Sequence, residues 1–276
     1  MAASPTRPGE PSTEVDQGRQ RFTWLLTSEW TKFRSVRSTF WTLLVTVIAT
    51  IGIGALISFA VESNHSHATA VERFMFDPTS TSLSGIGFAQ LALGVLGVLV
   101  ISSEYGTGMV RATFAATPRR HLVLAAKAIV FGSVALAIGL VCSFVAFFVG
   151  QRILALQAIQ TTISAPDVLR AVFGGGLYLT VMGLLALGIG ALIRHTAGAL
   201  AAFVGLILVL PAVAFALPSS WAHVVDKILP TDLGTGIGQV VPRAHFFGPW
   251  AGFGLFCAWA AAALVAAALV TAHRDA

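Results

Sequence analysis

Residues 171–225 read AVFGGGLYLTVMGLLALGIGALIRHTAGALAAFVGLILVLPAVAFALPSSWAHVV, and this stretch decides the fold. Arg194 is its only Asp, Glu, Lys or Arg, so the runs 171–193 and 195–225 carry none of these residues. About 20 apolar residues in a helix are enough to cross the ~30 Å hydrocarbon core of a bilayer. Both runs exceed that length, which predicts two membrane-spanning helices joined by a tight turn at residues 194–196.

Four further runs without Asp, Glu, Lys or Arg flank this pair, at residues 38–61, 78–103, 128–151 and 244–273. The chain of 276 residues is 56% hydrophobic and only 11% charged, too little polar sequence to cover the surface of a soluble globule. We therefore predict an all-α polytopic membrane protein with six transmembrane helices. The expected spans are about 39–60, 83–101, 128–150, 171–193, 197–217 and 250–271, within one six-span membrane domain of residues 38–273.

The distribution of charge predicts the orientation of these spans. If the N-terminus is cytoplasmic, six spans return the C-terminus to the same side, and most of the 17 Lys and Arg residues then lie on the cytoplasmic side. We expect both termini to be cytoplasmic in a bacterial plasma membrane. The net charge of +5 then reflects topology, and we expect no nucleic-acid partner.

The N-terminal region divides into two parts. Residues 1–20 contain almost no large apolar side chain, which predicts a disordered cytoplasmic tail. Residues 21–37 place apolar side chains at helical spacing, with basic residues on the other side and tryptophan at 24 and 30. This pattern predicts an amphipathic helix lying at the cytoplasmic headgroups; an ordinary solvated helix is the alternative.

The segment between the last two spans, residues 218–248, alternates prolines and glycines with short apolar pieces. No piece is long enough to cross a membrane, yet the segment is too apolar for a free loop. We expect an extracellular cap of short helices, partly re-entrant.

Chemistry-bearing motifs are scarce. No charged residue stands in the middle of a predicted span, where a proton or ion path usually needs one. The sequence has no G-x-x-x-x-G-K-[ST] phosphate loop and no H-E-x-x-H or G-x-S-x-G motif. We expect no enzyme activity and no cofactor or metal bound by this chain, so that any work requires energy from another subunit.

The informative polar element is the link 103–127 between the second and third spans, SEYGTGMVRATFAATPRRHLVLAAK. Thr107 can cap a short helix through residue 116, which Pro118 ends. Val110 and Phe114 would form an apolar ridge beside a group of basic residues. The link is therefore either a small docking surface or a basic loop that only fixes topology.

Two blocks of sequence, LLTSEWTKFRSVRSTFWTL at 25–43 and LGVLVISSEYGTGMVRATFAATPRRHLVLAAK at 96–127, resemble the permease subunits of type-2 ATP-binding-cassette (ABC) exporters in their actinobacterial form. The sharper part is Ser103-Glu104-Tyr105, Thr107-Gly108, Arg111, and then Pro118, Arg119 and Lys127.

The resemblance implies two six-span permeases, identical or different, and two separate cytoplasmic ATPase subunits that bind ATP-Mg. Residues 21–37 would be the connecting helix, with Trp24, Glu29, Trp30, Lys32, Arg34 and Arg37 as its candidate residues. The coupling contact to the ATPase would use Glu104, Tyr105, Thr107, Gly108, Arg111, Phe114, Arg119 and Arg120. Glu104 and Arg111 would transmit the ATP-driven movement to the spans.

The leading functional hypothesis is therefore export of an amphipathic or apolar substrate by alternating access. A non-transporting scaffold or sensor subunit and an ion-coupled secondary transporter are the alternatives. Close helix packing is expected at Gly94, Gly97, Gly183, Gly188 and Gly190. Pro211 is expected to kink the fifth span.

Overall fold

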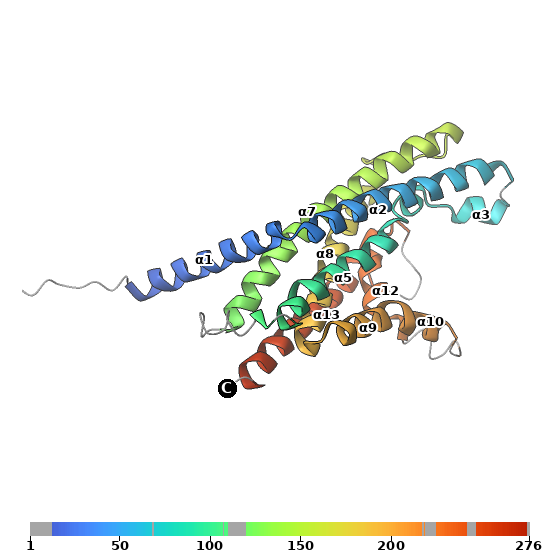
Figure 1. Cartoon of the computed structure of the whole chain (residues 1–276). Helices are drawn as coiled ribbons and strands as arrows, with labels where there is room; N and C mark the ends of the chain where they lie inside the picture. Colours follow the sequence, from blue (N-terminus) through green and yellow to red (C-terminus); the bar gives the residue numbers. More distant parts are fainter. Residues whose placement is uncertain are drawn as a thin grey trace, which may run out of the picture.

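The protein is described by a computed structural model over residues 13–67, 69–106, 108–109, 120–216, 218, 225–241 and 247–274 (Figure 1). These residues form helices joined by turns, with no strand among them. The longer helices are α1 (Thr13–Ser35), α2 (Arg37–Asn64), α5 (Ile86–Gly106), α7 (Arg120–Leu154), α8 (Val168–Ile193), α9 (Thr196–Val204) and α13 (Pro249–Arg274). The shorter elements are η1 (His65–His67), α3 (Ala70–Met75), α4 (Pro78–Ser82), η2 (Ala155–Gln157), η3 (Gly205–Val209), α10 (Leu210–Phe215), α12 (Pro230–Thr235) and η4 (Gly236–Gly238).

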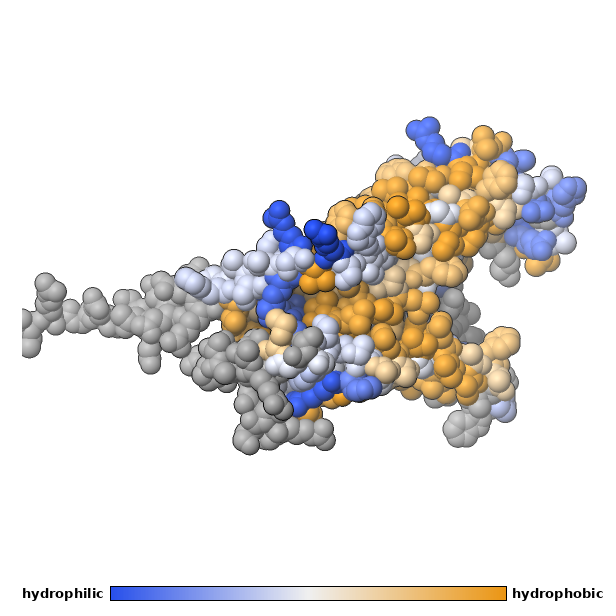
Figure 2. Space-filling model, in the orientation of Figure 1, coloured by the Kyte–Doolittle hydropathy of each residue, from blue (hydrophilic) through white to orange (hydrophobic). Residues whose placement is uncertain are grey.

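Six helical stretches of the described chain are long and apolar enough to cross a membrane. They are Arg37–His67, Ile86–Gly106, His121–Gln157, Val168–Ile193, Thr196–Phe215 and Pro249–Thr271. Each overlaps one predicted span, so the all-α architecture with six membrane-length helices is confirmed. Figure 2 shows apolar residues covering most of the visible bundle surface, with hydrophilic residues gathered toward its ends.

The second span begins later than predicted, at Ile86 instead of Leu83. Residues 78–82 form the separate helix α4, which starts at Pro78 and is capped by a hydrogen bond from the Thr79 amide to the Asp77 carboxylate at 2.8 Å. The same span ends at Gly106 instead of residue 101, so the link leaves the bundle one turn later than expected.

The N-terminal helix differs from the prediction at both ends. α1 begins at Thr13, so residues 13–20 are helical and their assignment to a disordered tail is wrong. No proline follows until Pro78, and once a helix has been nucleated each added residue extends it at little cost. Residues 1–12 lie outside the described part of the chain. α1 ends at Ser35, and Val36 alone separates it from α2. In Figure 1, α2 continues α1 in nearly the same direction.

Helix α8 is the central element of the bundle. It is the most buried of the six spans and packs against α5, α7 and α13. Leu179, Met182 and Leu185 on α8 lie in the main apolar core. The other spans arrange around this helix, and α1 contacts the bundle mainly through α7.

Close packing occurs at the five glycines that the sequence singled out, which confirms that prediction. A Cβ atom on Gly97 of α5 would lie 2.5 Å from the carbonyl oxygen of Gly183 on α8. Added Cβ atoms on the others would lie within 3 Å of a neighbouring helix: Gly94 against Phe203, Gly183 against Phe131, Gly188 against Ala263 and Gly190 against Ile101.

The turn between the fourth and fifth spans is as short as predicted. Arg194 ends α8 with φ of 59°, and the His195 ring nitrogen accepts a hydrogen bond from the Gly198 amide at the start of α9. The expected irregularity near Pro211 is also present. The π-helical turn η3 directly precedes α10, and a wider turn accommodates a proline that cannot donate to the preceding carbonyl.

Part of the predicted cap, 225–241, is described and contains the short helices α12 and η4. These pack on α8 and α13 at the end of the bundle where α8 begins. Gly234 lies against the ring of Tyr178, and the Arg170 guanidinium donates to the carbonyl oxygens of Ile237 and Gln239, both at 3.0 Å. The cap is therefore anchored to the bundle by packing and by charge-assisted hydrogen bonds.

We predict that Gly97→Ala lowers the free energy of unfolding by about 1–3 kcal/mol, because the new methyl group overlaps a backbone oxygen that cannot move aside without shifting α8. Gly87→Ala on the same helix is the matched control, since an added Cβ there has no atom within 4 Å. Thermal unfolding of the purified variants in detergent measures both. Equal melting temperatures for the two variants would contradict the close approach of α5 and α8.

Candidate functional site

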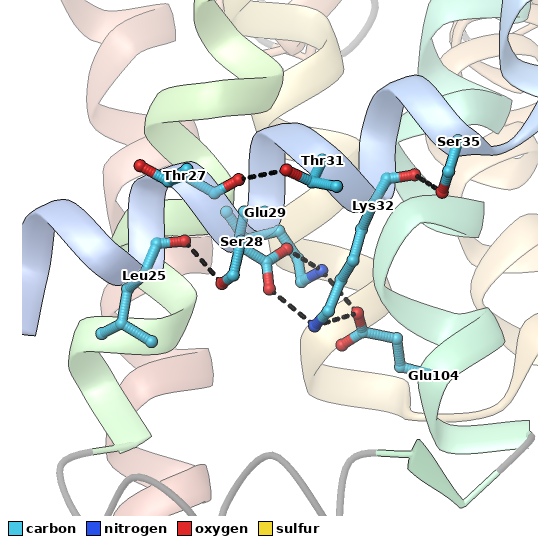
Figure 3. A network of polar contacts seen from close by, with 9 residues as sticks. Leu25, Thr27, Ser28, Glu29, Thr31, Lys32, Ser35 and Glu104 are labelled. Carbon is cyan, nitrogen blue, oxygen red and sulfur yellow. Dashed lines mark hydrogen bonds and ion pairs between the residues drawn. The ribbon is translucent and has the colours of Figure 1, made fainter.

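Four charged side chains from three helices form a cluster at one end of the bundle, which we call the charge cluster: Glu29, Lys32, Glu104 and Lys127. Figure 3 shows Glu29, Lys32 and Glu104 of this cluster. The Lys127 Nζ lies 2.6 Å from Oε2 of Glu29 and 2.9 Å from Oε1 of Glu104. The Lys32 Nζ lies 2.8 Å from Oε1 of Glu29 and 3.3 Å from Oε1 of Glu104. Each ammonium group is therefore shared by the same two carboxylates.

Local sequence positions each member of the charge cluster. Glu29 and Lys32 are three residues apart on α1, so they share one face of that helix. Glu104 lies in the last turn of α5, and Lys127 lies about two turns into α7. The cluster consequently joins α1 to both helices that flank the link 107–119.

The cluster is largely removed from water. The side chains of Glu29 and Lys127 are each 5% exposed, that of Glu104 is 12% exposed and that of Lys32 is 34% exposed. Burying a lone charge costs several kcal/mol, and this cost is offset only where opposite charges and hydrogen bonds are well placed. The four contacts meet this condition, so separating the three helices would strand charges in an apolar setting.

The charged neighbours of Glu29 and Lys32 set the pKa values of these two α1 side chains. Burial alone would raise the pKa of Glu29, but the neighbouring Lys127 and Lys32 ammonium groups outweigh it and hold that pKa below its ordinary value. Burial would likewise lower the pKa of Lys32, but its hydrogen bond to Glu29 and the charge of Glu104 raise it. Both groups are therefore held in their charged forms.

A second set of contacts lies at the same end of the bundle. The Arg194 guanidinium lies over the ring of Tyr105, 5.4 Å from its centroid, and the Thr196 hydroxyl donates to Ser102 Oγ at 3.0 Å. These contacts bind the α8–α9 turn to the last turns of α5. Tyr105, predicted as a coupling residue, is thus half-buried and packs against the bundle end.

The structure places the remaining predicted residues as follows. Trp24 and Trp30 are exposed on α1, at 77% and 49%, and Arg34 and Arg37 are also exposed. Gly108 adopts φ of +72° in the turn after α5, a conformation that favours glycine. Arg120 begins α7. Thr107, Arg111, Phe114 and Arg119 lie outside the described residues.

Sequence reasoning missed the central position of Lys127, which it named as part of the family resemblance and among the basic residues of the link but not as a partner of Glu29. A signal was available, because the chain has only three lysines and two of them stand in the charge cluster. Its partners, however, lie 98 and 23 residues away in the chain, which no local pattern reveals.

The polar residues within the spans mostly bond inside the bundle. The Tyr178 hydroxyl donates to the Gln90 side chain, and the Ser143 hydroxyl donates to the carbonyl of Val172 on α8. Among the described residues no group of three or more His, Cys, Asp or Glu side chains could hold a metal ion. The charge cluster is therefore the strongest candidate site that the described residues contain.

A cavity of about 470 Å³ opens beside the charge cluster. Glu29, Lys32, Glu104 and Lys127 line part of it, and the rest combines apolar residues such as Leu96 and Val130 with serine and threonine residues of α1, α2 and α5. Its size falls in the range of small-molecule sites. The charged groups and the cavity therefore belong to one region of the protein.

Comparison of the chain with protein-family models gave no match, and comparison with curated proteins gave none either.

We predict that Lys127→Met destabilises the protein by about 3–5 kcal/mol, because it leaves two buried carboxylates without the ammonium that makes the cluster's shortest contact. Lys32→Met is the matched comparison and should cost about 1 kcal/mol or less, since its ammonium is more exposed. Thermal unfolding in detergent compares them. A larger effect at Lys32 would show that the cluster is not organised around Lys127.

The lowered pKa of Glu29 gives a pH test with a definite sign. Its stabilising contribution is fully present above its ordinary value of 4.5 and is lost as pH falls through the depressed folded-state pKa. We expect the melting temperature of the native protein to exceed that of Glu29→Gln at neutral pH, and the difference to shrink below pH 4.5. A difference that stays constant down to the acid limit of folding would contradict the ionised state.

Proposed function

We propose that the chain is the transmembrane permease subunit of an ATP-driven ABC exporter in a bacterial plasma membrane, with both termini in the cytoplasm. An amphipathic or apolar substrate moves by alternating access between conformations. The energy comes from a separate cytoplasmic ATPase subunit that binds ATP-Mg. A second permease subunit, either another copy or a different chain, completes the pathway.

The charge cluster is the observation that supports this proposal most directly. The link 107–119 is the proposed contact for the ATPase, and both helices that leave it are tied to α1, α5 by the contact of Glu104 with Lys32 and α7 by the contact of Lys127 with Glu29. A displacement of the link therefore acts on α1, α5 and α7 together. A single flexible loop would absorb such a displacement without moving the spans.

Helix α1 is the proposed connecting helix at the cytoplasmic headgroups. Trp24 and Trp30 are exposed on it, together with Arg34 and Arg37. Tryptophan and basic side chains suit the boundary between lipid and water. In this proposal Glu29 and Lys32 face inward to the charge cluster, while the exposed residues face lipid or the ATPase.

Residues in and beside the link have different proposed roles. Glu104 is mostly covered by Lys32 and Lys127, which suits a residue that transmits movement into the bundle. Arg111, Phe114, Arg119 and Arg120 are the proposed contacts with the ATPase itself. The wall of the cavity beside the cluster is mostly apolar, in keeping with an amphipathic or apolar substrate.

The test begins with affinity purification of the full chain from its native membranes, which we expect to retain an ATPase subunit. In vesicles containing the pair, Glu104→Gln should lower the permease-dependent ATP hydrolysis about fivefold or more, because the coupling contact is weakened. Glu62→Gln, a carboxylate near the opposite end of α2, is the matched control and should leave hydrolysis unchanged.

Three outcomes would contradict the proposal. Partner binding without substrate movement would favour a scaffold or sensor subunit. Flux driven by a proton or sodium gradient without an ATPase would favour an ion-coupled transporter. Labelling of Ser28→Cys by a membrane-impermeant thiol reagent from outside the cell would place α1 in the wrong compartment.

A further inference from the structure

A groove follows the contact between α2 and α5, starting at the charge cluster. The cavity of about 470 Å³ beside the cluster and a second cavity of about 320 Å³ both include Thr42 in their walls. The second is walled by α2 and α5, and the first by residues of α1, α2, α5 and α7. The two cavities therefore succeed one another along a single path, which we call the α2–α5 groove.

The chemistry of the α2–α5 groove changes along its length. At the cluster end it is lined by Lys32, Glu104 and the hydroxyl-bearing Ser38 and Ser103. Farther along, Val45, Ala49, Phe88 and Ala92 line it. A molecule with one polar end and one apolar end matches this gradient.

Threonines in the apolar part do not alter its character. The Thr46 hydroxyl donates to the carbonyl of Thr42 at 2.7 Å, and the Thr50 hydroxyl donates to the carbonyl of Thr46 at 2.6 Å. Their donors are therefore used within α2 itself. This part of the groove offers an occupant mainly van der Waals contact.

The length of the groove fits one leaflet of a bilayer. On α2 it extends from Ser38 to Thr50, which at 1.5 Å per residue is about 18 Å. Half of a ~30 Å hydrocarbon core is about 15 Å. An acyl chain that begins at the cluster end would consequently reach the middle of the membrane.

The most accessible charge at the polar end is positive. Two cations, Lys32 and Lys127, and two acids, Glu29 and Glu104, line the cavity there. Both acids and Lys127 are largely covered, whereas the Lys32 side chain is 34% exposed. The open end of the groove therefore favours an anionic headgroup.

We propose that the α2–α5 groove binds one lipid with an anionic phosphate headgroup, taken from the leaflet at the cluster end. The phosphate lies at Lys32, and one acyl chain follows the groove past Ala49 and Ala92. The site goes beyond the proposed function, because lipid binding requires neither an ATPase nor transport.

The test titrates the purified full chain in detergent with phosphatidylglycerol or phosphatidylcholine of identical acyl chains, and counts bound lipids by native mass spectrometry. We expect phosphatidylglycerol to bind about tenfold more tightly. Lys32→Gln should remove most of this preference. Ala49→Leu should weaken binding of phosphatidylglycerol about tenfold as well, because the larger side chain fills the apolar part of the groove.

Two matched controls keep the result specific. Arg152→Gln removes an exposed cation at the opposite end of α7, and Ala201→Leu adds the same side chain to an exposed position of α9. Both should bind phosphatidylglycerol as the native protein does. Melting temperatures of all variants separate lost binding from lost folding, and Lys32→Arg should retain the preference where Lys32→Gln is unstable.

Equal affinity for the two lipids would overturn the proposal, as would unchanged binding in Ala49→Leu. Saturation of the site by glycerol phosphate as tightly as by the lipid would assign it to a free phosphate compound instead. Disulfide cross-linking between two copies of Ala49→Cys would show that a second chain covers the groove. Because no ATPase is present in the assay, each of these failures leaves the proposed export function untouched.

Discussion

The structure depends first on how closely the backbones of α5 and α8 approach each other. Lipid chains are as apolar as leucine, so the hydrophobic effect does not press membrane helices together, and van der Waals contact between backbones has to do so. Gly97 and Gly183 supply this contact, since a Cβ on Gly97 would overlap the Gly183 carbonyl oxygen. With α8 fixed among α5, α7 and α13, the ends of these helices are brought into register, and only then can charged side chains meet.

The charge cluster depends on this alignment of the helix ends. Buried ion networks contribute little net stability compared with apolar packing, but they penalise every arrangement that leaves one charge without a partner. Helix α1 has only a single non-helical residue, Val36, between it and the bundle, and its other main contact is α7. Glu29 therefore fixes where α1 lies, because moving it away would remove the shortest contact of the buried Lys127 and leave that ammonium with Glu104 alone. The cluster defines one geometry for three helices.

The sequence predicted what depends on local composition. A run without charged residues specifies a membrane-length helix wherever it stands, and small residues at 94, 97 and 183 predicted close packing without naming their partners. The start of α4 also has a local signal, because Asp77 before Pro78 is a capping pattern, whereas the break between α4 and α5 was not predicted. The position of Lys127 was not, since its bonds to Glu29 and Glu104 join distant segments and exist only once the helices have packed. The helical state of residues 13–20 was missed because composition reports the tendency to disorder but not the extension of a helix that begins nearby.

The charge cluster and the α2–α5 groove share Lys32, so an occupant of the groove would affect one side of the cluster more than the other. Of the four contacts in the cluster, the 3.3 Å contact between Lys32 and Glu104 is the longest, and Lys32 is the most exposed member. An anionic headgroup at the end of the groove competes with Glu104 for the same ammonium. Occupation of the groove would thus weaken the connection between α1 and α5, while the shorter bonds from Lys127 keep α1 on α7 and keep Glu104 in place. A lipid in the groove would therefore loosen the contact between α1 and α5 and leave the contact between α1 and α7 intact. Binding of the proposed lipid would in this way change how the two helices that flank the link are held to α1.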